Sequence, residues 1–162
     1  MGASISKGKQ NQVIGTPWEF MDALKKRFGN ITFDLAATKD NAKADKFFTE
    51  EDNALAQDWP RTGLCYLNPP FAHVTPWVKK AKEEGRLGTS TIMLVRASIT
   101  ARWFWDHVMG EALIIPLGPE RITFIGSEKS YPSGLMLICY GPRFGQGMAK
   151  LWSWQNDPDN WK

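Results

Sequence analysis

Apolar segments alternate with amphipathic segments along most of this chain. Short, nearly continuous apolar runs predict buried strands at 31–37, 64–67, 91–95 and 112–115. Between these runs, apolar residues at helical spacing predict helices at 16–28, 75–85 and 101–109. Because strands that alternate with helices form a mostly parallel sheet covered on both faces, an α/β domain is predicted.

Two further apolar runs, 122–125 and 135–140, predict an antiparallel hairpin at the C-terminal end of the sheet. A single domain is therefore expected over 14–140. The polar segment 1–13 before it is expected to be a flexible arm. The Trp- and Gly-rich tail at 141–162 either covers the sheet or forms a dimer contact.

The first predicted helix carries a strong start signal. Thr16 is expected to cap it, Pro17 to occupy its first position, and Glu19 to complete a capping box. Gly29 is expected to end this helix. The Thr-Pro pair at 75–76 predicts the start of the second helix by the same logic.

Composition narrows the class of protein without deciding its function. The chain has 162 residues, 43% of them hydrophobic, which suffices for the core of one domain. No apolar run approaches the roughly 18 residues of a membrane span, so we expect no membrane partner and a cytoplasmic location. Cys65 and Cys139 lie in apolar runs and are expected to be buried free thiols, and no spacing suggests a metal site. The net charge of +3 is compatible with nucleic acid but does not establish it.

The residues Asn68-Pro69-Pro70-Phe71 follow a predicted strand, at the end where open α/β sheets bind ligands. Such a motif suits the binding of an exocyclic amine, because the Asn68 side-chain oxygen and the Pro69 carbonyl can accept its two N–H groups. The two prolines fix the backbone and hold these acceptors rigidly. Phe71 offers a flat face to an extruded base. A rigid turn after a strand is the alternative interpretation.

Other polar positions could serve a sulfonium cofactor. The helix that opens at Thr16-Pro17 offers backbone donors for a carboxylate. Asp34 ends the first predicted strand, with small residues behind it, and Asp52 precedes the strand that leads to Asn68. Both carboxylates could accept the ammonium group or the adenine amine of such a cofactor. The alternatives are a turn residue at Asp34 and a helix cap at Asp52.

Taken together, these residues resemble the phage-type Dam family of N6-adenine DNA methyltransferases. The matching residues span about Thr16 to Gly126. They include Thr16-Pro17, Phe28-Gly29, Phe33-Asp34-Leu35-Ala36-Ala37, Asn41-Ala42, Thr49-Glu50-Glu51-Asp52, Leu55, Trp59, Asn68-Pro69-Pro70-Phe71, Trp77, Lys80-Ala81, Trp103-Phe104 and Arg121-Ile122-Thr123-Phe124.

The resemblance implies a Rossmann-like class I methyltransferase fold and S-adenosylmethionine as the methyl donor. It implies that Asn68 and Pro69 hold the target amine and that Phe71 stacks on the base. The cofactor contacts that it implies are at Thr16, Pro17, Asp34, Ala36 and Asp52.

The chain departs from the family pattern at several positions. Phe71 stands where many relatives have a tyrosine, and Ala36-Ala37-Thr38 replaces a glycine-rich loop. The segment 96–99 reads Arg-Ala-Ser-Ile where relatives often have Pro-Ala-Arg-Thr. Arg96 and Arg121 are candidate contacts with DNA phosphates, and surface charges without that role are the alternative.

The predicted reaction is methyl transfer to adenine N6, with DNA as the partner. The alternatives are methylation of RNA or of a protein amide nitrogen, and a catalytically silent nucleic-acid-binding module. A chain this short leaves little room for a target-recognition domain. Loose or short sequence specificity is therefore expected, unless a homodimer completes the DNA cleft. The resemblance also suggests marking of phage DNA against restriction, in the host cytoplasm.

Overall fold

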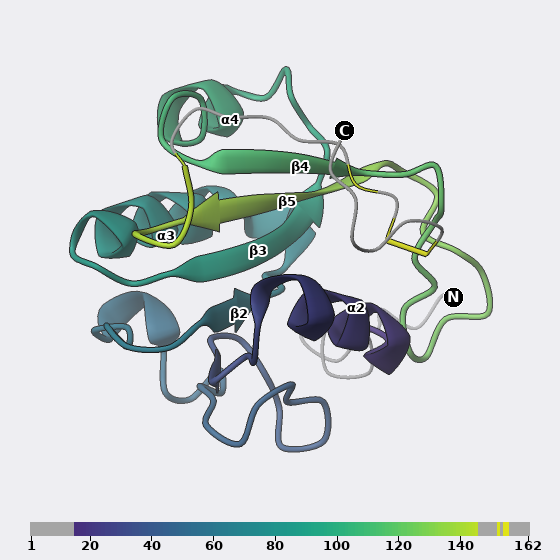
Figure 1. The fold of residues 1–162 in the computed structure, drawn as a ribbon, viewed down its shortest axis with the longest axis horizontal. Coiled ribbons are helices and arrows are strands. Elements are labelled where there is room, and N and C mark those ends of the chain that lie inside the picture. Colours follow the sequence, from purple (N-terminus) through teal and green to yellow (C-terminus); the bar gives the residue numbers. More distant parts are fainter. Residues whose placement is uncertain (1–14, 146–151, 153, 156–162) are drawn as a thin grey trace, which may run out of the picture.

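The computed structural model describes residues 15–145, 152, 154 and 155, which form an open five-stranded sheet (Figure 1). The strands are β1 (Phe33–Asp34), β2 (Cys65–Leu67), β3 (Thr91–Arg96), β4 (Leu113–Leu117) and β5 (Leu135–Tyr140). Their spatial order is β1-β2-β3-β5-β4. β1, β2 and β3 are parallel, and β5 runs antiparallel to both β3 and β4. The predicted Rossmann-like, mostly parallel α/β sheet is confirmed.

Helices cover both faces of this sheet, as predicted. They are α2 (Trp18–Phe28), α3 (Thr75–Arg86) and α4 (Arg102–His107), with single 3₁₀ turns at η1 (Ala54–Ala56) and η2 (Phe71–His73). One core packs α2 against the sheet, and the other packs α3 and α4 against the opposite face. Because successive strand residues point to opposite faces, Tyr66 belongs to the α2 core while Cys65 and Leu67 belong to the other.

The C-terminal antiparallel pair differs from the predicted one in its first strand. β5 pairs with β4, whose Leu113 lies opposite Cys139, and the predicted strand at 122–125 is wrong. That segment lies in the long connection between β4 and β5, where Ile125 forms an isolated bridge with Gly15. Its apolar pattern arises because Ile122 and Phe124 are buried against the α2 core from a loop.

The start of α2 also differs from the prediction. Pro17 precedes the helix in an extended conformation, and no side chain caps the helix, so the expected capping by Thr16 is wrong. The Thr16 hydroxyl is instead hydrogen-bonded to Tyr66, at 2.7 Å between the oxygens. Gly29 ends the helix as predicted, with a positive φ of 96°. α3 likewise begins at Thr75 with no side-chain cap.

The first predicted strand, at 31–37, is reduced to the two residues of β1. β1 lies at the edge of the sheet, and its hydrogen bonds are shared between β2 on one side and the segment 46–48 on the other. Burial of Ile31 and Leu35 explains the long apolar run without a long ladder. This short edge strand leaves the following residues free to turn away as a loop.

Parts of the Trp-rich tail pack into the α2 core. Trp152 and Trp154 are both buried, and the Trp154 ring lies 5.1 Å from that of Phe20. The arm at 1–13 lies outside the described residues, and the predicted domain limits stay predictions. Within the ranges that the structure describes, no helix has the length and apolar character needed to cross a membrane.

Candidate active site

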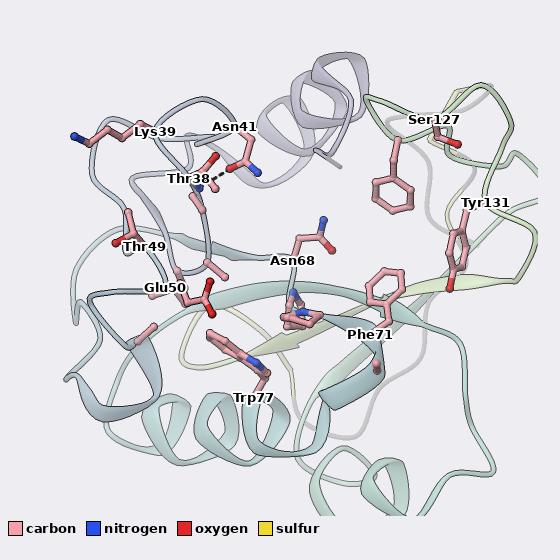
Figure 2. A pocket seen from close by; sticks show the side chains of 18 of the residues that line it. Thr38, Lys39, Asn41, Thr49, Glu50, Asn68, Phe71, Trp77, Ser127 and Tyr131 are labelled. Carbon is pink, nitrogen blue, oxygen red and sulfur yellow. Dashed lines mark hydrogen bonds between the residues drawn. The ribbon is translucent and has the colours of Figure 1, made fainter. Parts of the chain in front are cut away.

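A pocket of about 1010 Å³ opens beyond the carboxyl ends of β1 and β2. Five stretches of chain line it: 35–41 except Asp40, 49–54 except Asp52, 68–72, Trp77, and part of the β4–β5 connection (Phe124, Ser127 and 129–132). Figure 2 shows Asn68 near its centre, between Glu50 and Trp77 on one side and Phe71 and Tyr131 on the other. The pocket therefore lies where the topology of an open α/β sheet places a ligand site.

The motif at 68–71 enters this pocket directly from β2. Asn68 follows the last strand residue, Pro69 is buried, and Phe71 begins the 3₁₀ turn η2. All four residues line the pocket, as predicted from the sequence. In the described part of the chain, no hydrogen bond from another protein group reaches the Pro69 carbonyl. That carbonyl and the Asn68 side chain are the polar groups that the motif offers to a ligand.

The Asn68 amide has a defined orientation. Its Nδ2 donates a hydrogen bond to the Thr16 hydroxyl at 3.2 Å. The Thr16 hydroxyl also pairs with the Tyr66 hydroxyl, so the three side chains form one chain of hydrogen bonds. Figure 2 shows the amide oxygen turned towards the side of the pocket where Phe71 and Tyr131 lie. The acceptor end of the amide is thus presented to the pocket.

Three rings form one side of the pocket, which we call the aromatic wall. Phe71, Phe124 and Tyr131 pack edge to face, with ring centroids 5.4 to 6.2 Å apart. Phe71 follows β2, Phe124 and Tyr131 lie in the β4–β5 connection, and all three line the pocket. Such a surface can accept a flat aromatic ligand beside Asn68.

Arg96 and Arg121 hold the aromatic wall from outside the pocket. Arg96 donates to the Tyr131 hydroxyl through Nε at 3.2 Å and Nη2 at 3.1 Å. Arg121 donates to the backbone carbonyls of Tyr131, at 3.1 Å, and Pro132. Both arginines are exposed, and neither lines the pocket. Their predicted contacts with DNA phosphates stay predictions, and the structure gives them a second role in fixing Tyr131.

The opposite side, which we call the loop wall, consists of the segments 35–41 and 49–54. Asp34 stabilises the first segment from beneath, because its buried carboxylate accepts hydrogen bonds from the backbone N–H groups of Ala36 (3.2 Å) and Lys43 (2.9 Å). Burial raises the pKa of Asp34, and these two hydrogen bonds and the Lys43 charge oppose that rise. Ala36 lines the pocket, whereas Asp34 itself does not.

Asp52 stabilises the second segment of the loop wall in a similar way. Its Oδ2 accepts hydrogen bonds from the backbone N–H (2.7 Å) and the hydroxyl (2.9 Å) of Thr49. These hydrogen bonds lower the pKa of the exposed Asp52 carboxyl. Asp52 does not line the pocket, and neither do Thr16 and Pro17, whose hydroxyl and carbonyl bond to protein groups. Cofactor contacts at these positions stay predictions.

Several pocket groups were not singled out as site residues by the sequence. Glu50 lines the loop wall and is exposed, and Trp77 lies below it in Figure 2. Thr38 also lines the pocket, and its buried hydroxyl has no hydrogen-bond partner among the described residues. Glu50 and Trp77 lie in segments that matched the family pattern, which was the available signal. Tyr131 had no such signal, because only the folded chain brings it to Phe71.

The two cysteines lie away from the pocket chemistry. Both are buried free thiols, as predicted. Burial raises the pKa of Cys65 to about 12, and it raises the pKa of Cys139 as well. Neither thiol is therefore available as a thiolate nucleophile near neutral pH.

Comparisons with known proteins place the chain in a family. A family model described as DNA N-6-adenine-methyltransferase (Dam) matches residues 4–135. A DNA N-6-adenine-methyltransferase of Haemophilus phage HP1 is 30% identical over 158 residues, covering 93% of this chain and 90% of that protein. The enzyme of the same description from Escherichia phage T1 is 33% identical over 126 residues, which are 78% of this chain and 53% of that protein. A solved structure described as a putative RNA methyltransferase of Pyrococcus horikoshii aligns at a TM-score of 0.44 and 15% identity, covering 76% of this chain and 80% of that one.

Proposed function

This chain belongs to the DNA N-6-adenine-methyltransferase (Dam) family, and we propose that its pocket transfers a methyl group to N6 of adenine in DNA. The observation that carries this proposal is the position of Asn68. Its amide oxygen and the Pro69 carbonyl stand in one pocket, between a polar loop wall and an aromatic wall. Two acceptors beside stacked rings suit an aromatic base that carries an amine.

The target adenine is proposed to lie against the aromatic wall. An adenine inside a duplex is out of reach, so the base has to be extruded, which costs a few kcal/mol. Stacking on Phe71 and its neighbouring rings offsets that cost by roughly 1–3 kcal/mol. The Asn68 Oδ1 and the Pro69 carbonyl then accept the two N–H groups of the amine. Because Pro69 and Pro70 restrict the backbone, these acceptors are in place before the reaction begins.

The methyl donor is proposed to be S-adenosylmethionine, bound along the loop wall. The residues present fit this group. The pocket is at the upper end of the volumes found for small-molecule sites, which leaves room for a donor beside a base. Glu50 supplies an acceptor for hydroxyl or ammonium groups, and the unpartnered hydroxyl of Thr38 can pair with a ligand after a side-chain rotation. When bound, S-adenosylmethionine supplies a methyl group activated by its positively charged sulfur.

The predicted cofactor residues divide between direct and indirect roles in this proposal. Ala36 contacts the cofactor, since it lines the loop wall. Asp34 and Asp52 keep that wall in shape through their hydrogen bonds to backbone N–H groups. Pro17 acts through the start of α2, where its carbonyl accepts from the N–H groups of Phe20 and Met21.

DNA contacts are proposed at the rim of the pocket. Exposed Lys39 and Lys129 lie on the loop wall and on the opposite side, respectively, and can bind phosphates on both flanks of an extruded base. Arg96 and Arg121 stand behind Tyr131 and can add phosphate contacts through their remaining N–H groups. We further propose short or loose sequence specificity, a homodimer as the form that would lengthen the DNA cleft, and action on phage DNA in the host cytoplasm.

A substrate panel tests this function. Duplex DNA, single-stranded RNA and a protein mixture are incubated with methyl-labelled S-adenosylmethionine, and the products are digested and identified by mass spectrometry. The proposal predicts N6-methyladenine from DNA. Label found only in RNA or on a protein amide would contradict it. A folded protein that shows no binding of S-adenosylmethionine by calorimetry would support a catalytically silent module instead.

A further inference from the structure

We propose that Thr16 is a positioning residue for methyl transfer, because it fixes which end of the Asn68 amide faces the pocket, with Tyr66 holding the Thr16 hydroxyl in turn. This inference rests on the function proposed above. It replaces helix capping, which the structure excludes for Thr16, with a role in the reaction itself.

The two ends of an asparagine side chain have opposite hydrogen-bonding character. The oxygen accepts hydrogen bonds, whereas the NH₂ group only donates them. An adenine amine also donates, so it can bind Asn68 only if the amide oxygen points at it. A half-turn of the amide would present Nδ2 to the amine and would set donor against donor. The enzyme therefore needs a group that favours one of the two orientations.

Thr16 is placed to be that group. Its hydroxyl oxygen accepts from Asn68 Nδ2 at 3.2 Å, which leaves the amide oxygen free for the pocket. The same oxygen lies 2.7 Å from the Tyr66 hydroxyl, which gives the Thr16 hydroxyl a second partner. When Thr16 donates to the Tyr66 oxygen, its proton is taken up there and a lone pair is left to accept from Asn68 Nδ2. Without Tyr66, that proton could turn to the Asn68 oxygen and favour the wrong orientation.

The fold explains how these three residues meet. Tyr66 lies in β2 and belongs to the α2 core, and Asn68 follows the last residue of β2, so that the alternation of the strand carries its side chain to the same side. Thr16 lies two residues before α2, the helix that covers that face. Thr16 and Tyr66 are each only 1% exposed, and neither lines the pocket. They can therefore act on a bound base through Asn68 and not by touching it.

The Tyr66 phenol is suited to a permanent place in this chain of hydrogen bonds. Burial raises its pKa, the Thr16 hydrogen bond opposes the rise, and the nearby Asp34 charge adds to it. The phenol consequently keeps its proton throughout the pH range in which the protein would work. A neutral hydroxyl partner for Thr16 is thus maintained.

Thr16→Val tests the inference, because valine keeps the shape of threonine and removes the hydroxyl. We expect kcat at saturating DNA and cofactor to fall by about tenfold or more, since the amine loses an oriented acceptor. The dissociation constant for S-adenosylmethionine, measured by calorimetry, should stay within about threefold. Thr16→Ser restores the hydroxyl and should return kcat to within about threefold of the wild type. Tyr66→Phe should lower kcat severalfold.

Thr91→Val provides the matched control. Thr91 is fully buried in β3, and its hydroxyl has no hydrogen-bond partner in the part of the chain that the structure describes. The same change therefore removes the same atoms without breaking a described bond. Its kcat should equal that of the wild type. Thermal unfolding of every variant shows whether each is folded at the assay temperature. If Thr16→Val does not fold, Tyr66→Phe carries the test alone.

The outcomes separate this inference from the function on which it rests. A wild-type protein that forms no N6-methyladenine in DNA overturns both. If the wild type is active and the folded Thr16→Val variant keeps its full kcat, only the positioning role is overturned. If Thr16→Val does not fold, the same result with a folded Tyr66→Phe variant overturns it. A rise in the cofactor dissociation constant well beyond threefold would assign Thr16 to the cofactor and would also overturn it.

Discussion

The two sides of the pocket are built by different means. The loop wall at 35–41 and 49–54 is held by short-range hydrogen bonds, in which Asp34 and Asp52 accept from backbone N–H groups two to nine residues away. The aromatic wall is held by ring packing and by Arg96, which reaches a tyrosine 35 positions further along the chain. The loop wall is thus held largely by contacts that are close in the sequence, whereas the aromatic wall also joins distant parts of the chain, at Phe71, Arg96 and 121–132.

This difference matches the ligands that we assign to the two walls. The loop wall offers backbone groups, a threonine hydroxyl and the carboxylate of Glu50, which suit a polar donor with an amino acid moiety and a ribose. The aromatic wall offers flat apolar faces, which suit a base. Asn68 stands between them, at the place where the methyl group has to pass. Variants of the two walls should therefore separate cofactor binding from DNA methylation.

The largest effect is expected at the junction of the walls. Asn68→Ala removes an acceptor of the target amine and should lower kcat by about a hundredfold to a thousandfold. Cofactor affinity, measured by calorimetry, should change little, because the loop wall is intact. Retention of wild-type kcat in this variant would show that the role given to Asn68 is wrong.

Variants of the aromatic wall should come next. Tyr131→Ala removes one ring and the anchor of Arg96, and should lower kcat/KM for DNA by about tenfold to a hundredfold, in line with the stacking energy of a base. Cofactor affinity should stay close to that of the wild type. Phe71→Tyr keeps a stacking ring and serves as the conservative control. An equal loss of cofactor affinity in Tyr131→Ala would contradict the separation of the walls.

Variants of the loop wall should weaken cofactor binding and leave DNA binding nearly unchanged. Glu50→Gln removes a charged acceptor and should raise the dissociation constant for S-adenosylmethionine by about fivefold, a moderate effect because Glu50 is exposed. The KM for DNA should be nearly unchanged. Glu19→Gln changes an exposed glutamate on α2, outside the pocket, and provides the control. If the two variants bind the cofactor equally well, Glu50 is not a cofactor ligand.

The smallest effect on activity is expected from a carboxylate outside both walls. Glu84 on α3 is buried, and burial acts to raise the pKa of its carboxyl. The carboxylate accepts hydrogen bonds from Lys80, Arg61 and the Trp59 N–H. These bonds outweigh the effect of burial and hold the pKa below its ordinary value of 4.5. A lowered pKa in the folded state stabilises the protein above the unfolded-state value, and this contribution is lost as the pH falls through the folded-state value.

Glu84→Gln should accordingly lower the free energy of unfolding by about 2 kcal/mol near pH 7, since Lys80 and Arg61 lose their partner. Urea unfolding at several pH values checks this, and the difference from the wild type should shrink as the pH falls below about 4.5, where the unfolded-state carboxyl protonates. The kcat should be unchanged below the unfolding transition. A difference that persists undiminished in acid would contradict the assigned pKa shift.

The sequence predicted the features that depend on local pattern. Apolar runs located β3 and β5 because those strands are central and buried on both faces. The motif at 68–71 was found because strand, amide and prolines are adjacent in the chain. The strand predicted at 122–125 was wrong because a loop whose side chains are buried has the same apolar pattern as a strand.

Contacts between residues far apart in the chain could not be predicted from the sequence. Thr16 lies 52 positions from Asn68 and 50 from Tyr66, so the sequence predicted a helix cap and a cofactor contact for it but neither of these partners. Asp34 and Asp52 were expected to bind the cofactor because its ammonium and adenine amine need acceptors, with a turn residue and a helix cap as the alternatives. In the fold they satisfy backbone N–H groups of the loops that follow or precede them. A sequence pattern can identify a polar residue near a site, but it does not show which of several groups that residue will hydrogen-bond.

A crystal structure with a cofactor analogue and an extruded adenine would show directly how the target amine is held. We expect N6 to lie about 3 Å from both Asn68 Oδ1 and the Pro69 carbonyl, with the base against Phe71 and the analogue along the loop wall. A base bound outside the pocket, or an amine facing Asn68 Nδ2, would contradict it.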